Sequence, residues 1–183
     1  MSDIFTELET DHQVVLRLVQ QLHTPGLAPD ARDRIVQRLV MEESKHEAAE
    51  EMWFWPAVRE LLSNGEGLRN AGLDQEEEAK ALLQQLMEAP AASLEVDRLL
   101  GELLPAVRAH VDYEQARVWP ALRSALPPAT AHKLGARYRS SYQNGPTRPH
   151  PRTPADPAVL KVAGRAAAAV DRARDALTRR GVS

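Results

Sequence analysis

Two stretches of the chain carry a histidine and a glutamate four residues apart. The first is His46-x-x-x-Glu50, and the second, 64 positions later, is His110-x-x-x-Glu114. On a helix, residues at this spacing lie on one face, with their Cβ atoms about 5–6 Å apart. Each pair therefore presents an imidazole and a carboxylate to the same point, which is a geometry suited to binding a metal ion.

The repeat extends beyond these two pairs. Each pair is followed by the same Trp-Pro-Ala tripeptide, and Leu-Val-Gln-Gln-Leu at 18–22 recurs as Leu-Leu-Gln-Gln-Leu at 82–86. This register aligns His12 with Glu76. We interpret the sequence as two copies of a helical hairpin, each with one candidate ligand on its first helix and two on its second.

Four amphipathic helices should position these residues. The apolar periodicity predicts helices at about 3–23, 30–62 and 73–87, and a fourth that begins at a Ser93 cap. Pro56 and Pro120 should kink their helices one to two turns beyond the glutamates. The fold class is therefore all-α: an up-down-up-down four-helix bundle with a C-terminal Pro-rich extension and a further helix.

The chain divides at a change of composition. Residues 1–127 should form the bundle, and residues 128–183 a basic Pro-rich and Ala-rich extension, extended over 138–157 and helical over 158–180. Residues 1–136 hold 13 Lys and Arg against 23 Asp and Glu, a balance of −10, whereas 137–183 hold 10 against 3, a balance of +7. Complementary charge should hold the tail on the acidic body; contact with nucleic acid or a membrane is the alternative.

Several classes of protein and site are excluded or disfavoured. The chain has no cysteine, which excludes thiolate metal sites, iron–sulfur clusters and disulfides. Its first residues lack the features of a secretory signal, and no segment approaches the ~20 apolar residues that span a bilayer, so we expect a cytoplasmic protein with no membrane span. No phosphate loop, nucleophile elbow or helix-turn-helix signal occurs. We expect no nucleic-acid partner, because prolines and alanines interrupt the basic residues of the tail, which are not clustered. Whether the protein is an enzyme stays open.

The predicted stripes bring six ionisable residues into one layer of the bundle core. Burying them is costly unless each is paired or bound to metal. Imidazoles and carboxylates together suit iron or manganese, and two carboxylates on facing helices could bridge two ions. The alternative, His–Glu pairs on solvated faces, agrees less well with their place among Leu and Val. Glu51, next to the candidate ligand Glu50, should instead lie on the solvated side of its helix. The candidate metal ligands are His12, His46, Glu50, Glu76, His110 and Glu114.

These motifs resemble the hemerythrin-like, or HHE cation-binding, domain. The resemblance covers residues 3 to about 126 and rests on His12 after an aspartate and on the two His-x-x-x-Glu motifs with their following prolines. It implies a four-helix bundle that holds a non-haem di-iron centre through histidines and two bridging carboxylates. A small diatomic or peroxide ligand, such as O2, NO or hydrogen peroxide, would meet iron there.

The departure from the family pattern lies on the third helix. One or two histidines are expected there, whereas this chain has Ala71, Gly72 and Glu76. Either Glu76 replaces an imidazole as ligand, or the second iron position has been lost. The extra carboxylate also favours an iron-handling or oxidase-like role as an alternative. A metal-free interaction bundle, whose basic tail binds an unidentified protein, is the remaining possibility.

Overall fold

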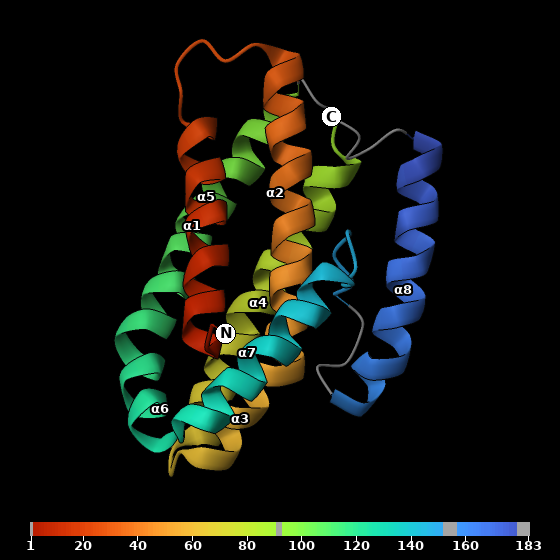
Figure 1. Cartoon of the computed structure of the whole chain (residues 1–183). Coiled ribbons are helices and arrows are strands. Elements are labelled where there is room, and N and C mark those ends of the chain that lie inside the picture. Colours follow the sequence, from red (N-terminus) through yellow and green to blue (C-terminus); the bar gives the residue numbers. More distant parts are fainter. Residues whose placement is uncertain (1, 91–92, 152–156, 179–183) are drawn as a thin grey trace.

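The computed structural model describes residues 2–90, 93–151 and 157–178, which form helices and no strands (Figure 1). In chain order the elements are α1 (Ile4–Leu22), α2 (Pro29–Ala49), η1 (Glu50–Phe54), α3 (Trp55–Leu61), α4 (Gly65–Glu88), α5 (Leu94–Tyr113), η2 (Glu114–Val118), α6 (Trp119–Ala125), α7 (Pro128–Gln143) and α8 (Pro157–Thr178).

Four helical rods make the predicted bundle. The segments α2, η1 and α3 follow one another without a break, as do α5, η2 and α6, and these two rods pack with α1 and α4. Asp3 caps α1 by accepting the backbone N–H of Thr6 at 2.8 Å, and Ser93 caps α5 as the sequence predicts. No helix in the described part of the chain is long and apolar enough to cross a membrane.

The apolar core is divided into two clusters. One is built on Val19, Leu39, Leu83 and Leu103, from the C-terminal parts of α1 and α4 and the N-terminal parts of α2 and α5. The other includes Phe5, Phe54, Trp55, Trp119 and Tyr138. The predicted metal ligands fall between the two clusters along each rod, so apolar layers separate them from solvent in both directions along the bundle.

Each long rod contains a five-residue π-helix that begins at a ligand candidate. The N–H of Trp55 donates to the carbonyl of Glu50, and that of Trp119 donates to the carbonyl of Glu114. The proline that follows each tryptophan has no N–H to donate, and its ring crowds the carbonyl four residues back, which a wider turn relieves. The irregularity thus begins at the glutamates and runs to Phe54 and Val118, two residues before each proline.

Close contacts explain why α4 begins earlier than expected. Its first residue is Gly65, whereas the periodicity predicted a start near Leu73. A Cβ at Gly65 would lie 2.2 Å from the carbonyl oxygen of Val58, so glycine allows a tight connection from α3. Gly72, within α4, leaves room for the ring of Trp55, which would lie 2.2 Å from a Cβ at this position.

The C-terminal segment packs on the bundle. Helix α7 contacts α1, α2 and η1, and α8 lies beyond it at the side of the molecule (Figure 1). Residues 138–143, expected to be extended, are the last turns of α7, because Tyr138 is fully buried against the bundle. Arg139 pairs with Glu7 at 2.5 Å and with Asp11 at 3.1 Å, as complementary charge between tail and body predicts. Residues 152–156 and 179–183 of the predicted tail lie outside the described residues.

Candidate metal centre

Two overlapping groups of possible metal ligands meet in the layer between the apolar clusters. His12 on α1 joins His46 and Glu50, and Glu50 also joins His110 and Glu114. Within each group the possible ligand atoms all lie within 4.8 Å of one another. Glu50 belongs to both groups.

The two carboxylates each face two different histidines. Oε1 of Glu50 lies 3.2 Å from Nε2 of His46, and its Oε2 lies 3.7 Å from Nε2 of His110. Oε2 of Glu114 lies 3.3 Å from Nε2 of His12, and its Oε1 lies 3.7 Å from Nε2 of His110. Glu50 and Glu114 thus stand between His110 on one side and the pair His12 and His46 on the other.

These polar atoms are buried and several have no partner. The glutamates Glu50 and Glu114 are 0% exposed, and none of their four carboxylate oxygens has a hydrogen-bond partner; the same holds for Nε2 of His12 and of His110. An unsatisfied buried polar atom costs roughly 1–3 kcal/mol, and more when it is charged. A cation between these atoms would satisfy them together, so the donor set fits a metal ion such as iron or manganese.

The protonation of the site agrees with its fit to a cation. Burial, and then the nearby Glu114 and Glu76, raise the pKa of Glu50 well above its usual range. Burial, and then His12 and His110, hold the pKa of His46 well below its usual range. His46 is therefore a neutral imidazole, the form that binds metals, and a cation would supply the charge that lets Glu50 ionise in the core.

A tyrosine of α7 orients one of the histidines. The hydroxyl of Tyr138 donates to Oδ2 of Asp11 at 2.9 Å, so its oxygen accepts a hydrogen bond from the N–H at Nδ1 of His46 at 2.7 Å. This contact assigns the proton of His46 to Nδ1 and leaves Nε2 free beside Glu50. Sequence reasoning missed Tyr138, because nothing in its local sequence shows which residue 92 positions away it will contact.

The remaining histidines have contacts of their own. His12 stacks on Trp119 with ring centroids 5.5 Å apart, and the side-chain amide of Gln115 lies 3.3 Å from its Nδ1. The Nδ1 atom of His110 lies 3.3 Å from Oε1 of Gln75. Trp119 therefore contributes to the site by packing against His12.

Glu76 is buried in the same layer but stands apart from the two groups. It lines a small cavity with His12, His46 and His110, and it is 1% exposed. Its Oε1 accepts a hydrogen bond from the indole of Trp55, and its Oε2 has no hydrogen-bond partner and lies 3.8 Å from Nζ of Lys80. The structure thus brings five predicted ligands together and places Glu76 at the edge, so its role as a ligand stays a prediction.

Three more carboxylates of α2 and η1 are buried nearby. Glu43 lines the small cavity, and burial raises its pKa to about 7. Glu47, which sequence reasoning did not single out, is 2% exposed. Glu51 is 4% exposed and pairs with Lys80, so its predicted place on the solvated side is wrong. The lysine of α4 compensates the charge of Glu51 in the core.

Comparison with known proteins agrees with this geometry. The family model of the hemerythrin HHE cation binding domain matches residues 3–122. The chain belongs to this family. An uncharacterized hemerythrin-like protein of Schizosaccharomyces pombe is 27% identical over 148 residues, which cover 80% of this chain and 72% of the yeast protein. Membership in the HHE family and the buried His and Glu groups together support metal binding.

A solved structure shares the fold of this HHE protein. The crystal structure of a hemerythrin HHE cation binding domain-containing protein from Mycobacterium kansasii matches with a TM-score of 0.66 and 19% identity. The match covers 93% of this chain and 99% of the mycobacterial chain, so it extends past residue 127 into the C-terminal helices. At this identity the likeness concerns the fold alone.

Proposed function

We propose that this HHE protein binds two non-haem iron ions in the bundle core and meets a small diatomic or peroxide ligand there. The observation that carries the proposal is the placement of Glu50 and Glu114, each of which turns its two oxygens toward different histidines. A carboxylate so placed suits bridging of two ions. One ion would have His12 and His46, and the other would have His110.

The unequal number of histidines supports Glu76 as a further ligand on the His110 side. Its Oε2 has no hydrogen-bond partner, and the indole of Trp55, which donates to its Oε1, lies beside His110 with ring centroids 6.3 Å apart. When bound, iron supplies redox chemistry with oxygen-derived ligands, while the protein supplies a pocket whose apolar walls include Val15, Ala79 and Val107. Manganese fits the same donors.

A second candidate function is iron handling or oxidase-like chemistry. Glu43 and Glu76 add two buried carboxylates that line the small cavity of the site, and anionic oxygen donors stabilise the ferric state over the ferrous state. Such a site would oxidise irreversibly and would not bind oxygen reversibly.

Metal analysis with optical spectroscopy tests these functions. Two iron ions per chain in the purified or reconstituted protein support the proposal, whereas one ion indicates that the second position has been lost. Protein that takes up no metal would instead be an interaction bundle. After anaerobic reduction, a visible band that appears with oxygen and is reversed by removing it supports a carrier or sensor, and irreversible oxidation supports the oxidase-like alternative.

A further inference from the structure

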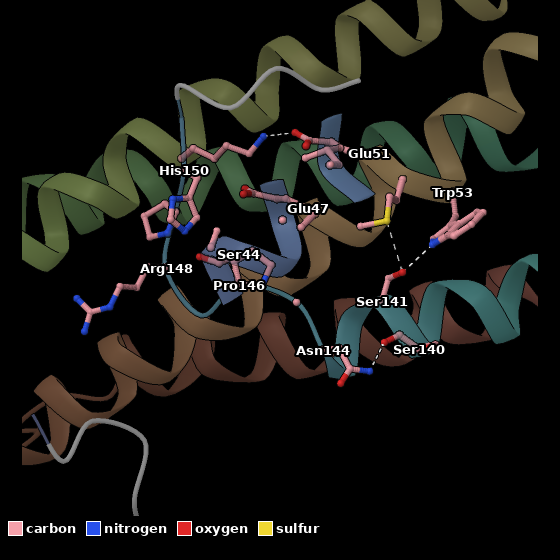
Figure 2. A pocket seen from close by; sticks show the side chains of 18 of the residues that line it. Ser44, Glu47, Glu51, Trp53, Ser140, Ser141, Asn144, Pro146, Arg148 and His150 are labelled. Carbon is pink, nitrogen blue, oxygen red and sulfur yellow. Dashed lines mark hydrogen bonds and ion pairs between the residues drawn. The ribbon is translucent and has the colours of Figure 1, made fainter. Parts of the chain in front are cut away.

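A second, larger cavity (the outer cavity) is lined by residues of α2, η1, α7 and α8. Its volume is about 490 Å³, and it lies between the bundle and the C-terminal segment that follows α7. Figure 2 shows Ser44, Glu47 and Glu51 on one wall and Pro146, Arg148 and His150 on another. Met52, Trp53 and Leu160 supply part of its apolar lining.

Glu47 separates this outer cavity from the small cavity at the metal centre. The inner cavity is lined by His12, His46, Glu76 and His110, and Glu47 also lines it. Of the described residues, Glu47 is the one that lines both cavities. Its side chain is therefore the wall between the metal centre and the outer cavity.

The carboxylate of Glu47 is buried and only partly satisfied. The residue is 2% exposed, yet its Oε2 has no hydrogen-bond partner. It stands midway in a row of glutamates at four-residue spacing along one side of the rod: Glu43 lines the inner cavity and Glu51 lines the outer one. A buried carboxylate oxygen without a hydrogen-bond partner is costly, and a cation beside it would remove that cost.

The approaches along the bundle axis are blocked for an ion. The predicted ligands are at most 9% exposed, and the apolar clusters close the bundle above and below them. Moving a hydrated dication through an apolar layer carries a large desolvation cost, whereas carboxylate oxygens can replace its water ligands step by step. The row of glutamates on α2 offers such oxygens from the outer cavity inward.

We propose that a divalent cation bound for the metal centre enters through the outer cavity and is passed inward by Glu47. The proposal rests on the metal binding proposed above. Lys80, which pairs with Glu51 and lies 3.8 Å from Glu76, holds positive charge beside the route and so opposes the passage of a cation. Replacing the carboxylate of Glu47 by an amide should slow uptake, and removing the charge of Lys80 should speed it.

Stopped-flow uptake of cobalt(II) by the full-length metal-free protein tests the route, because bound cobalt absorbs in the visible range. We expect Glu47→Gln to slow uptake at least about tenfold, in the range of electrostatic effects on association rates, while final stoichiometry and affinity stay as in the parent. Glu42→Gln is the matched control. Glu42 is also buried on α2 but pairs with Arg38 and Tyr142 and lines neither cavity.

The Lys80→Gln variant should take up cobalt faster than the parent, whereas Glu47→Gln should take it up more slowly. A general loss of stability in both variants would not produce effects of opposite sign. Faster uptake in Lys80→Gln supports the route. Parental uptake rates in both Glu47→Gln and Lys80→Gln overturn it, as does equal slowing in Glu47→Gln and Glu42→Gln. Each of these results leaves metal binding itself intact. Failure of the parent protein to bind any metal would instead contradict the proposed function.

Discussion

The hydroxyl of Tyr138 lies 2.7 Å from Nδ1 of His46, although the two residues are 92 positions apart. Tyr138 belongs to α7, which follows the four rods of the bundle, and it also donates to Asp11 beside His12. The C-terminal segment thus supports a predicted metal ligand from outside the four rods.

Tyr138→Phe should weaken metal binding while leaving the number of bound ions unchanged. Loss of a group that orients a ligand histidine typically costs 10–100-fold in affinity, and we expect about that loss here. Competition with a chelator of known affinity measures it. Tyr142→Phe is the control, because Tyr142 donates to Glu42 and not to a predicted ligand. Equal affinities in the two variants would show that Tyr138 only packs.

Ending the chain at residue 127 should cost much more stability than ending it at residue 145. The shorter chain loses Tyr138, which is 0% exposed, and the close contact in which Gly135 meets the backbone of Asp3. Removing one large buried aromatic side chain costs about 3–5 kcal/mol, so we expect at least that difference in the free energy of unfolding. Urea unfolding of the metal-free proteins measures it. Equal midpoints would support an independent bundle of residues 1–127.

The sequence predicted the rods well because their signals are local. The spacing of His46 and Glu50, the Ser93 cap and the apolar stripes each depend on residues within a turn or two. The helical state of residues 138–143 was not predicted, since it depends on burial of Tyr138 against α1, α2 and η1. Tertiary packing overrides the weak local preference of an Arg- and Ser-rich segment.

The site was predictable where it depends on the register of a single helix, and not where it depends on contacts between helices. The register on each helix identified which residues face the core, but it did not show that Lys80 of α4 would meet Glu51 and bury it. Pairings between helices depend on how the rods turn about their axes, and a π-helix that begins beside Glu51 changes that turn. For this reason Glu51 is not a suitable exposed control for ligand substitutions; Glu60, with a 68% exposed side chain, is.

Bound metal should raise the free energy of unfolding. The ligand carboxylates should therefore stabilise the fold when metal is bound and not when metal is absent. At free metal about 100 times its dissociation constant, one bound ion adds about 2.7 kcal/mol to the free energy of unfolding. Glu50→Ala and Glu114→Ala should each lose most bound metal, and Glu60→Ala should not. Metal content and thermal melting with and without chelator measure both effects.

The metal-free proteins give the second half of this prediction. Glu50→Gln removes an ionisable group that is 0% exposed and whose oxygens have no hydrogen-bond partner. The metal-free variant should therefore be at least as stable as the metal-free parent. If Glu50 instead stabilises the fold through its histidine contacts alone, Glu50→Gln will melt lower than the parent in the presence of chelator.

Substitutions of Glu76 test whether it is the ligand that replaces an imidazole. If it binds iron, Glu76→His should raise the ferric/ferrous potential, because a neutral donor in place of an anion destabilises the more highly charged ion. The reduced variant should then hold oxygen longer before irreversible oxidation. Glu76→Ala should lose one iron or bind both loosely, since only water could fill the open position.

Glu76→Gln separates this role from a structural one. The amide oxygen of glutamine can still accept from the indole of Trp55, which donates to Glu76 in the parent, so this variant keeps that hydrogen bond while it removes the charged ligand. We expect it to lose iron as Glu76→Ala does while melting close to the parent in chelator. If iron content, potential and autoxidation rate are the same in the parent and all three variants, Glu76 only anchors Trp55. The site would then consist of His12, His46, Glu50, His110 and Glu114.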